Sequence, residues 1–97
     1  MKDITVVATF VAKPGQEAEL KKALLSLIAP TRQEAGCLNY DLHQRTGNPA
    51  LFLFHENWAS KADLDRHLQK PDLQAVLARV GGMLTEPPQI TLWEKID

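Results

Sequence analysis

Hydrophobic and polar residues recur along the chain with two different periods. Alternating or β-branched apolar patterns, which are typical of strands, cover residues 4–11, 38–43, 51–58 and 90–96. Apolar residues spaced three or four apart, which are typical of helices, run through residues 16–28, 60–68 and 71–80. Glycine and proline residues separate these segments. The predicted order is therefore β-α-β-β-α-α-β, with two helices in the second crossover.

This order predicts an α+β fold of the ferredoxin-like class. In that class a four-stranded antiparallel sheet carries its helices on one face. The two middle strands are expected to form a hairpin, because turn residues 46–49 lie between them. No repeat or low-complexity segment is present, so residues 1–97 are expected to form a single domain.

Three local signals refine the predicted helices. Pro30 lacks an amide hydrogen, so the first helix is expected to kink or break there and to resume briefly. Ser60 is the expected N-cap of the second helix, with Asp63 three residues later in a capping-box arrangement. Gly81 and Gly82 are expected to cap the end of the third helix.

One face of the predicted sheet has no helix to cover it. Strand alternation places five apolar side chains on that face: Val7, Val11, Leu51, Leu53 and Trp93. An exposed apolar patch of this kind usually marks an interface. We therefore expect a homodimer that forms through the open sheet face.

Composition excludes several classes of partner. The 97 residues include 11 Lys and Arg against 12 Asp and Glu, with no basic run, so nucleic acid is not an expected partner. No apolar stretch is long enough to span a membrane, and the N-terminus does not resemble a signal peptide. Cys37 is the only cysteine, which excludes an internal disulfide and favours a cytoplasmic location.

His67 is the most informative polar residue. Counting from Ser60 as the N-cap, it shares the inward face of its helix with Leu64 and Leu68. An imidazole held against aromatic rings beside a carboxylate can accept or donate a proton near neutral pH. His67 is therefore the candidate catalytic base or substrate anchor. The alternative is a core histidine with a satisfied hydrogen bond.

The strand pattern supplies a set of partners for His67. Alternation places Phe52, Phe54, Glu56 and Trp58 on the helix side of the sheet, with Tyr40 on the neighbouring strand. Glu56 is expected to orient the imidazole or raise its basicity, as an acid does in a catalytic triad. The four aromatic residues are expected to bind substrate, Trp58 by stacking and Tyr40 through its hydroxyl. Core packing of Trp58, an ordinary ion pair of Glu56 and a solvent-facing Tyr40 hydroxyl are the alternatives.

No metal or nucleotide cofactor is expected. Cys37, His43 and His55 do not lie at a recognised ligand spacing, and no third partner is evident. The paired glycines 81–82 follow a helix rather than a strand, so they do not form a phosphate-binding loop.

Four short motifs resemble one known family. They are Pro14-Gly15, Glu34-Ala35-Gly36-Cys37 leading to Tyr40, Glu56-Asn57-Trp58-Ala59-Ser60, and His67-Leu68-Gln69-Lys70-Pro71. In this order they resemble the antibiotic biosynthesis monooxygenase family, and especially its small quinol monooxygenases, over essentially the whole chain. The resemblance implies a dimeric α+β barrel. For several members it also implies oxygen insertion from dioxygen into an aromatic or quinol substrate, without flavin, haem or metal.

The resemblance does not extend to every branch of the family. Haem-degrading relatives have an asparagine and a histidine where this chain has Ala8 and Leu77. Polyketide-oxidising relatives have an asparagine and a tyrosine where this chain has Phe54 and Leu64. Both activities are therefore disfavoured.

The sequence thus predicts a cofactor-independent monooxygenase that acts on a small aromatic or quinol substrate. Two alternatives stay open. One is an isomerase of a small carbonyl or sugar-phosphate compound, since a histidine and a carboxylate can move a proton beside a carbonyl. The other is a non-enzymatic, stress-related barrel that only binds a small ligand.

Overall fold

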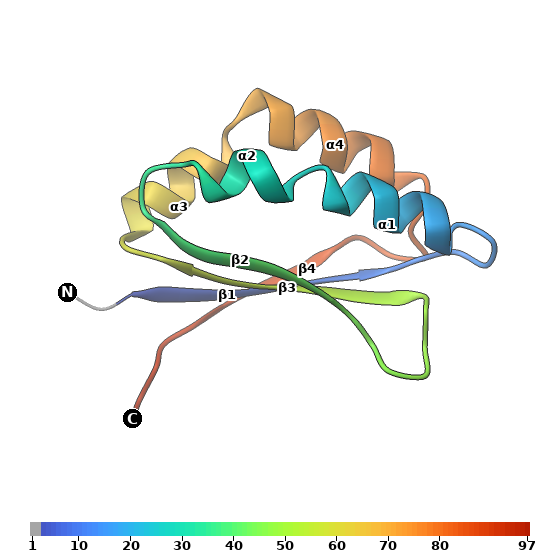
Figure 1. Ribbon diagram of the computed structural model, residues 1–97, viewed down its shortest axis with the longest axis horizontal. Helices are drawn as coiled ribbons and strands as arrows, with labels where there is room; N and C mark the ends of the chain where they lie inside the picture. Colours follow the sequence, from blue (N-terminus) through green and yellow to red (C-terminus); the bar gives the residue numbers. More distant parts are fainter. Residues whose placement is uncertain (1–2) are drawn as a thin grey trace.

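The strands and helices follow the predicted order along the chain. The computed structural model describes residues 3–97. Its elements are β1 (Ile4–Val11), α1 (Glu17–Leu25), α2 (Ile28–Arg32), β2 (Cys37–Gln44), β3 (Leu51–Trp58), α3 (Lys61–Leu68), α4 (Pro71–Gly81) and β4 (Gln89–Trp93). The sheet order is β2-β3-β1-β4 with antiparallel neighbours, and the helices lie on one side of it (Figure 1). The ferredoxin-like prediction is confirmed.

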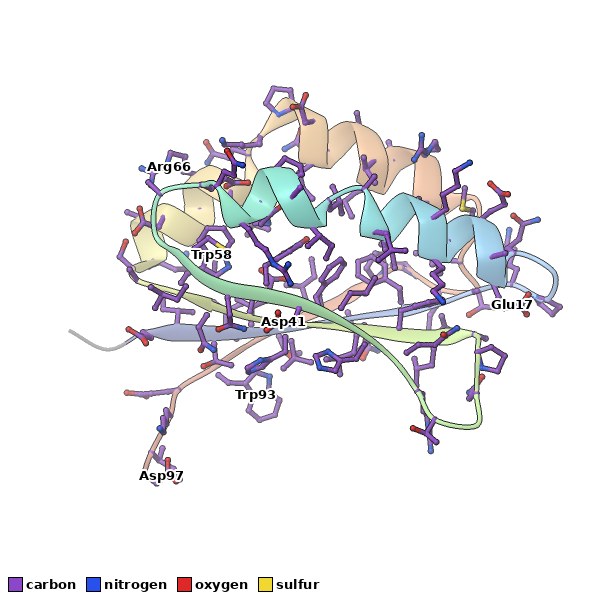
Figure 2. All side chains as sticks on the ribbon, viewed as in Figure 1. Glu17, Asp41, Trp58, Arg66, Trp93 and Asp97 are labelled. Atoms are coloured by element: carbon purple, nitrogen blue, oxygen red, sulfur yellow. The ribbon has the colours of Figure 1, made fainter. Side chains whose placement is uncertain are left out.

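Strand β3 places its side chains as the alternation predicted. Phe52, Phe54, Glu56 and Trp58 are each at most 4% exposed. Figure 2 shows Trp58 between the sheet and the helices, whereas Trp93 lies on the opposite side of the sheet. Glu56 pairs with Val6 on one side and with Tyr40 on the other, so its carboxyl lies centrally beneath the helices.

The helical segment between β1 and β2 is interrupted before Pro30, whereas the sequence predicted a kink or break at Pro30 itself. Helix α1 ends at Leu25, and Pro30 is the third residue of α2. An amide in the first turn of a helix has no intrahelical acceptor, so the missing hydrogen of Pro30 costs nothing there. The chain turns instead at Leu27, whose amide donates to the Leu24 carbonyl at 3.1 Å in a tighter, three-residue turn.

A β-bulge changes the predicted alternation of β2. Cys37 opposes Trp58 and Asn39 opposes Asn57, so Leu38 is an extra residue between them. Strict alternation with the inward-facing Tyr40 would place Leu38 on the helix side of the sheet. Leu38 is instead 54% exposed, and Cys37 takes the inward position. The predicted alternation holds only from Tyr40 onward.

The last strand is shorter than predicted. Strand β4 ends at Trp93, which pairs with Thr5, and the chain beyond it is not a strand. Among residues 3–97, β4 pairs with β1 alone, and this pairing runs from Gln89 opposite Thr9 to Trp93 opposite Thr5. Ile96 is 95% exposed.

The two later helices begin as predicted. The Ser60 hydroxyl oxygen accepts a hydrogen bond from the Asp63 amide at 3.1 Å, and the same hydroxyl donates to the Asp63 carboxylate at 2.9 Å. Helix α4 ends at Gly81, and its C-cap is Gly82, as predicted, but the φ of Gly82 is −72° rather than the left-handed value usual for a glycine cap. None of the helices within residues 3–97 combines the length and apolarity needed to cross a membrane.

The loop before β2 is held tightly against the start of α3. The Gly36 carbonyl accepts a hydrogen bond from the Ala59 amide at 2.8 Å. Gly36 has a φ of +84°, and a Cβ at this position would collide with the Asp63 side chain. Asp63 is itself held by Ser60 and by an ion pair with Arg66. Only glycine therefore allows this approach.

We predict that Gly36→Ala destabilises the protein more than Gly47→Ala. Gly47 also has a positive φ, of +79°, but a Cβ there would meet nothing within 4 Å. Both variants incur the left-handed backbone cost of about 1–2 kcal/mol. Gly36→Ala should lose a further 1–3 kcal/mol or so through overlap with Asp63. Urea unfolding of the three proteins measures the difference, and equal losses would contradict the tight approach.

Candidate functional site

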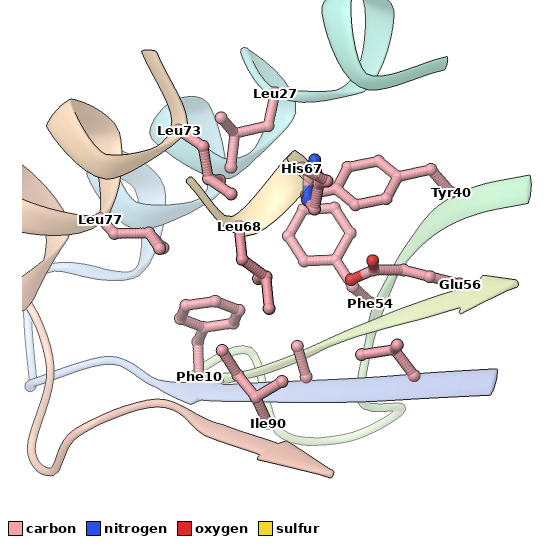
Figure 3. A pocket seen from close by; sticks show the side chains of 12 residues that line it. Phe10, Leu27, Tyr40, Phe54, Glu56, His67, Leu68, Leu73, Leu77 and Ile90 are labelled. Atoms are coloured by element: carbon pink, nitrogen blue, oxygen red, sulfur yellow. The ribbon is translucent and has the colours of Figure 1, made fainter. Parts of the chain in front are cut away.

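An apolar pocket lies between the sheet and helices α3 and α4 (Figure 3). Its walls are Val6, Ala8, Phe10, Leu27, Tyr40, Phe54, Glu56, His67, Leu68, Leu73, Leu77 and Ile90. The accessible volume is about 20 Å³, which is enough for about one water molecule. Ile90 is 41% exposed, and Leu68 and Leu77 are half-buried. A ring-sized ligand therefore requires these outer side chains to move.

His67 occupies the inward face of α3, as predicted, but its acidic partner is Glu34. The His67 Nδ1 atom lies 3.0 and 3.1 Å from the two carboxylate oxygens of Glu34. The side chains are 3% and 10% exposed, respectively. Glu34 is 33 residues away in the sequence, so spacing alone could not pair it with His67. The available signal was its place in the Glu34-Ala35-Gly36-Cys37 motif.

The second ring nitrogen of His67, Nε2, has different surroundings from Nδ1. Within residues 3–97, no group forms a hydrogen bond with its Nε2 atom, and no fully buried side-chain nitrogen or oxygen lacks a partner. Nε2 is therefore not sealed from the pocket that His67 lines. A free imidazole nitrogen in such a position can accept a proton from a bound ligand.

Glu56 lines the same pocket but does not orient His67. Its Oε1 atom accepts a hydrogen bond from the Trp58 indole nitrogen at 2.9 Å. The expectation that Glu56 orients the imidazole was wrong, because Trp58 holds the carboxylate and Glu34 takes its place. Burial raises the pKa of Glu56 to about 7, although the Trp58 hydrogen bond lowers it, and the nearby charge of Glu34 adds to the rise. Glu56 can therefore donate or accept a proton near neutral pH.

Trp58 and Phe52 do not line the pocket. The Trp58 indole stacks on the His67 ring, with centroids 4.6 Å apart and planes inclined by 29°. It is fully buried, so the aromatic face expected to meet a substrate meets the imidazole instead. Phe52 is 1% exposed within the main core cluster, away from the pocket walls.

Tyr40 and Phe54 do lie in the pocket wall, as the sequence predicted. Their rings stack with centroids 4.5 Å apart, and Tyr40 meets His67 edge-on at 5.7 Å. The hydroxyl of Tyr40 forms a hydrogen bond with the Thr31 side chain. Burial raises the pKa of Tyr40, the Glu56 charge raises it further, and the Thr31 hydrogen bond lowers it. Tyr40 therefore remains a neutral phenol.

The pocket wall contains no lysine or arginine among the residues that the structure describes. Arg32, the nearest candidate, donates to the Tyr40 carbonyl at 3.2 Å and pairs with Asp41 at the surface. Two carboxyl groups, from Glu34 and Glu56, lie within or beside the pocket. This electrostatic environment disfavours phosphate and other anionic ligands. Residues 3–97 also hold no cluster of three His, Cys, Asp or Glu side chains suited to a metal ion.

Comparison with known proteins gives consistent matches in sequence and in structure. The family model for antibiotic biosynthesis monooxygenase matches residues 3–79. The Mycobacterium tuberculosis protein named "Putative monooxygenase Rv0793" is 35% identical over 94 residues, which cover 97% of this chain and 92% of that protein. The solved structure of Rv0793 has a TM-score of 0.90 at 32% identity, covering 98% of this chain and 96% of that one. The crystal structure of PA3566 from Pseudomonas aeruginosa has a TM-score of 0.93 at 33% identity, covering 100% and 97%.

We predict that the Glu56 carboxyl makes the folded protein less stable as the pH rises from about 4.5 to about 7. The folded protein retains the Glu56 proton up to about pH 7, whereas the unfolded chain releases it near its ordinary pKa of 4.5. Stability therefore falls across this window and levels off above it, by about 3 kcal/mol in total. Glu56→Gln removes the titration and should lack this loss.

Urea unfolding at several pH values between 4 and 8 measures the effect as the difference between the two proteins. Glu86→Gln, at an exposed carboxyl, is the matched control and should follow the wild-type profile. A difference between Glu56→Gln and wild type that stays constant with pH would show that folding does not raise the pKa of Glu56.

Proposed function

The chain belongs to the antibiotic biosynthesis monooxygenase family, and on this basis we propose that it oxidises a small, neutral aromatic or quinol substrate with dioxygen. The family resemblance inferred from the sequence motifs is confirmed, and membership supports a monooxygenase-like role. The observation that carries the proposal is His67, which lines the apolar pocket and whose Nε2 atom has no hydrogen-bond partner among residues 3–97. In this proposal the protein needs no bound cofactor.

The chemistry begins with loss of a proton from the substrate. Nε2 of His67 accepts the proton of a quinol hydroxyl, and the resulting anion is electron-rich enough to reduce dioxygen directly. One oxygen atom then forms a bond to a ring carbon, and the other leaves as water. The balance is hydroquinone plus dioxygen giving hydroxyquinone plus water, with the substrate supplying all four electrons. The apolar walls exclude bulk water from the reactive anion.

The walls of the pocket favour this substrate class over a sugar phosphate. Phe10, Phe54 and the Tyr40 ring offer aromatic surfaces to a flat, neutral molecule. A phosphate group would lie beside two carboxyl groups without a lysine or arginine in the wall. The isomerase alternative therefore has no supporting observation here, at least for a phosphorylated compound.

We also propose that the chain forms a homodimer through the open face of its sheet. The strand register places Val7, Val11, Leu51, Leu53 and Trp93 on the side away from the helices. Trp93 is 58% exposed in the single chain, and the other four side chains are half-buried. A second copy that packs on this face would remove the apolar surface from water.

Replacement of His67 tests the proposed reaction. We predict that the wild-type protein speeds oxygen uptake by one or more reduced benzoquinols or naphthoquinols above spontaneous oxidation. His67→Gln should reduce the catalysed rate by roughly a hundredfold or more, the usual scale for loss of a general base. Glu86→Gln, at an exposed side chain outside the pocket and outside the sheet, is the control and should leave the rate unchanged.

Labelled dioxygen separates insertion from simple oxidation. Monooxygenation transfers one ¹⁸O atom into the organic product, whereas an oxidase would release both atoms as hydrogen peroxide. Uptake at the spontaneous rate with every quinol would refute the proposed function. Ligand binding that persists in His67→Gln would then favour the non-enzymatic alternative.

Leu53→Lys tests the proposed dimer. Leu53 lies at the centre of the open face, and a buried, unpaired charge there should weaken association about a hundredfold or more. Leu25→Lys, at a leucine on α1 that is 50% exposed, is the matched control and should remain dimeric. Light scattering after size-exclusion chromatography measures the mass. A monomeric wild type, or a Leu53→Lys variant as dimeric as wild type, would exclude this interface.

A further inference from the structure

Glu34 contacts His67 from outside the pocket, and its position has a chemical consequence. We propose that Glu34 is a positioning residue that holds His67 in the tautomer with hydrogen on Nδ1, which leaves Nε2 as the proton acceptor in the pocket. The inference rests on the proposed function only for the step in which Nε2 takes a proton from substrate. The tautomer itself is a property of the resting protein.

The hydrogen-bond geometry determines which ring nitrogen carries the proton. Both Glu34 carboxylate oxygens lie within 3.1 Å of His67 Nδ1. An ionised carboxylate can only accept hydrogen bonds, so Nδ1 must be the donor. A neutral imidazole carries one hydrogen, so Nε2 is left with its lone pair exposed. The contact is nearly closed to water, because the two side chains are 10% and 3% exposed.

The two acidic side chains near His67 have different surroundings and therefore different roles. Glu56 lines the pocket and is held by the Trp58 indole, so it can meet a ligand directly. Glu34 is absent from the pocket wall and reaches only the far side of the imidazole ring. Glu34 thus acts through His67, whereas Glu56 has access to the substrate.

The backbone holds Glu34 and His67 in a fixed relation. The Glu34 amide donates to the Thr31 carbonyl at 3.0 Å, and the Cys37 amide donates to the Glu34 carbonyl at 3.2 Å. The same loop is fixed to α3 through Gly36, which packs against Asp63 and accepts the Ala59 amide. Since α3 also carries His67, the loop and the histidine are held by one set of contacts.

Aromatic neighbours limit rotation of the imidazole. Trp58 covers one face of the ring, with centroids 4.6 Å apart, and Tyr40 meets it edge-on at 5.7 Å. A flipped ring would lose the Glu34 hydrogen bond and leave a nearly buried carboxylate unpaired, which is costly. When Nε2 accepts the substrate proton, the adjacent Glu34 carboxylate stabilises the imidazolium that forms.

Nitrogen NMR of ¹⁵N-histidine protein tests the tautomer directly. The sequence has three histidines, so the signal missing from His67→Gln identifies His67. We expect the wild-type protein at pH 8 to show hydrogen on Nδ1 of His67. Glu34→Gln, whose amide can donate or accept, should lose this preference and give a mixture of tautomers or hydrogen on Nε2. Glu86→Gln is the matched control and should keep the wild-type spectrum.

Kinetics supply the second measurement. If quinol oxidation is present, Glu34→Gln should lower kcat by roughly 10- to 100-fold, the usual effect of losing the group that orients a functional histidine. KM should change little, because Glu34 does not touch the pocket. Thermal melting of each variant shows whether a loss reflects unfolding.

The outcomes separate this inference from the proposed function. Hydrogen on Nε2 in the wild type, or a tautomer unchanged in folded Glu34→Gln, would overturn the role of Glu34 even if quinols are oxidised. A tautomer that depends on Glu34 in a protein without oxygen uptake would support the positioning role and refute the monooxygenase proposal. A tautomer that depends on Glu34, together with catalysed oxygen uptake, would support both the positioning role and the proposed function.

Discussion

The candidate site depends on the side-chain alternation of β3. This strand pairs with β1 on one side and β2 on the other, so both of its edges restrict a shift in register. A slip of one residue would turn Phe52, Phe54, Glu56 and Trp58 to the opposite face. Burial of three large aromatic rings opposes such a slip, and it thereby also forces a carboxyl group into the interior. The position of Glu56 is thus a consequence of the hydrophobic packing around it.

Burial of charge explains how the polar groups divide their roles. A carboxylate in an apolar environment needs hydrogen-bond donors or it takes up a proton. Glu34 obtains its donor from His67, whereas Glu56 obtains one from the Trp58 indole. The indole therefore serves two side chains, because it donates to Glu56 through its nitrogen and supports His67 with its face.

Much of this arrangement could be predicted from the sequence, because it depends on local periodicity. The inward faces of β3 and α3, and therefore the placement of His67 in the pocket, follow from periods of two and about 3.6 residues. The Glu34–His67 pair could not be predicted in this way, because tertiary packing brings the loop before β2 to helix α3. The sequence pattern also did not predict the bulge at Leu38 or the position of the helix break at Leu27, for a related reason. Each is a one-residue adjustment to neighbouring elements that leaves no periodic signal.

Because the pocket is small, ligand affinity depends on two conformations: one with the outer side chains in place and one in which they have moved aside. Only the fraction of molecules whose outer side chains have moved can admit a ring, so the apparent dissociation constant is the intrinsic one divided by that fraction. Substitutions that enlarge the entrance could therefore tighten binding without adding any contact. Under the proposed reaction they would also admit water to the substrate anion, so ligand affinity and exclusion of water place opposite demands on Leu68, Leu77 and Ile90.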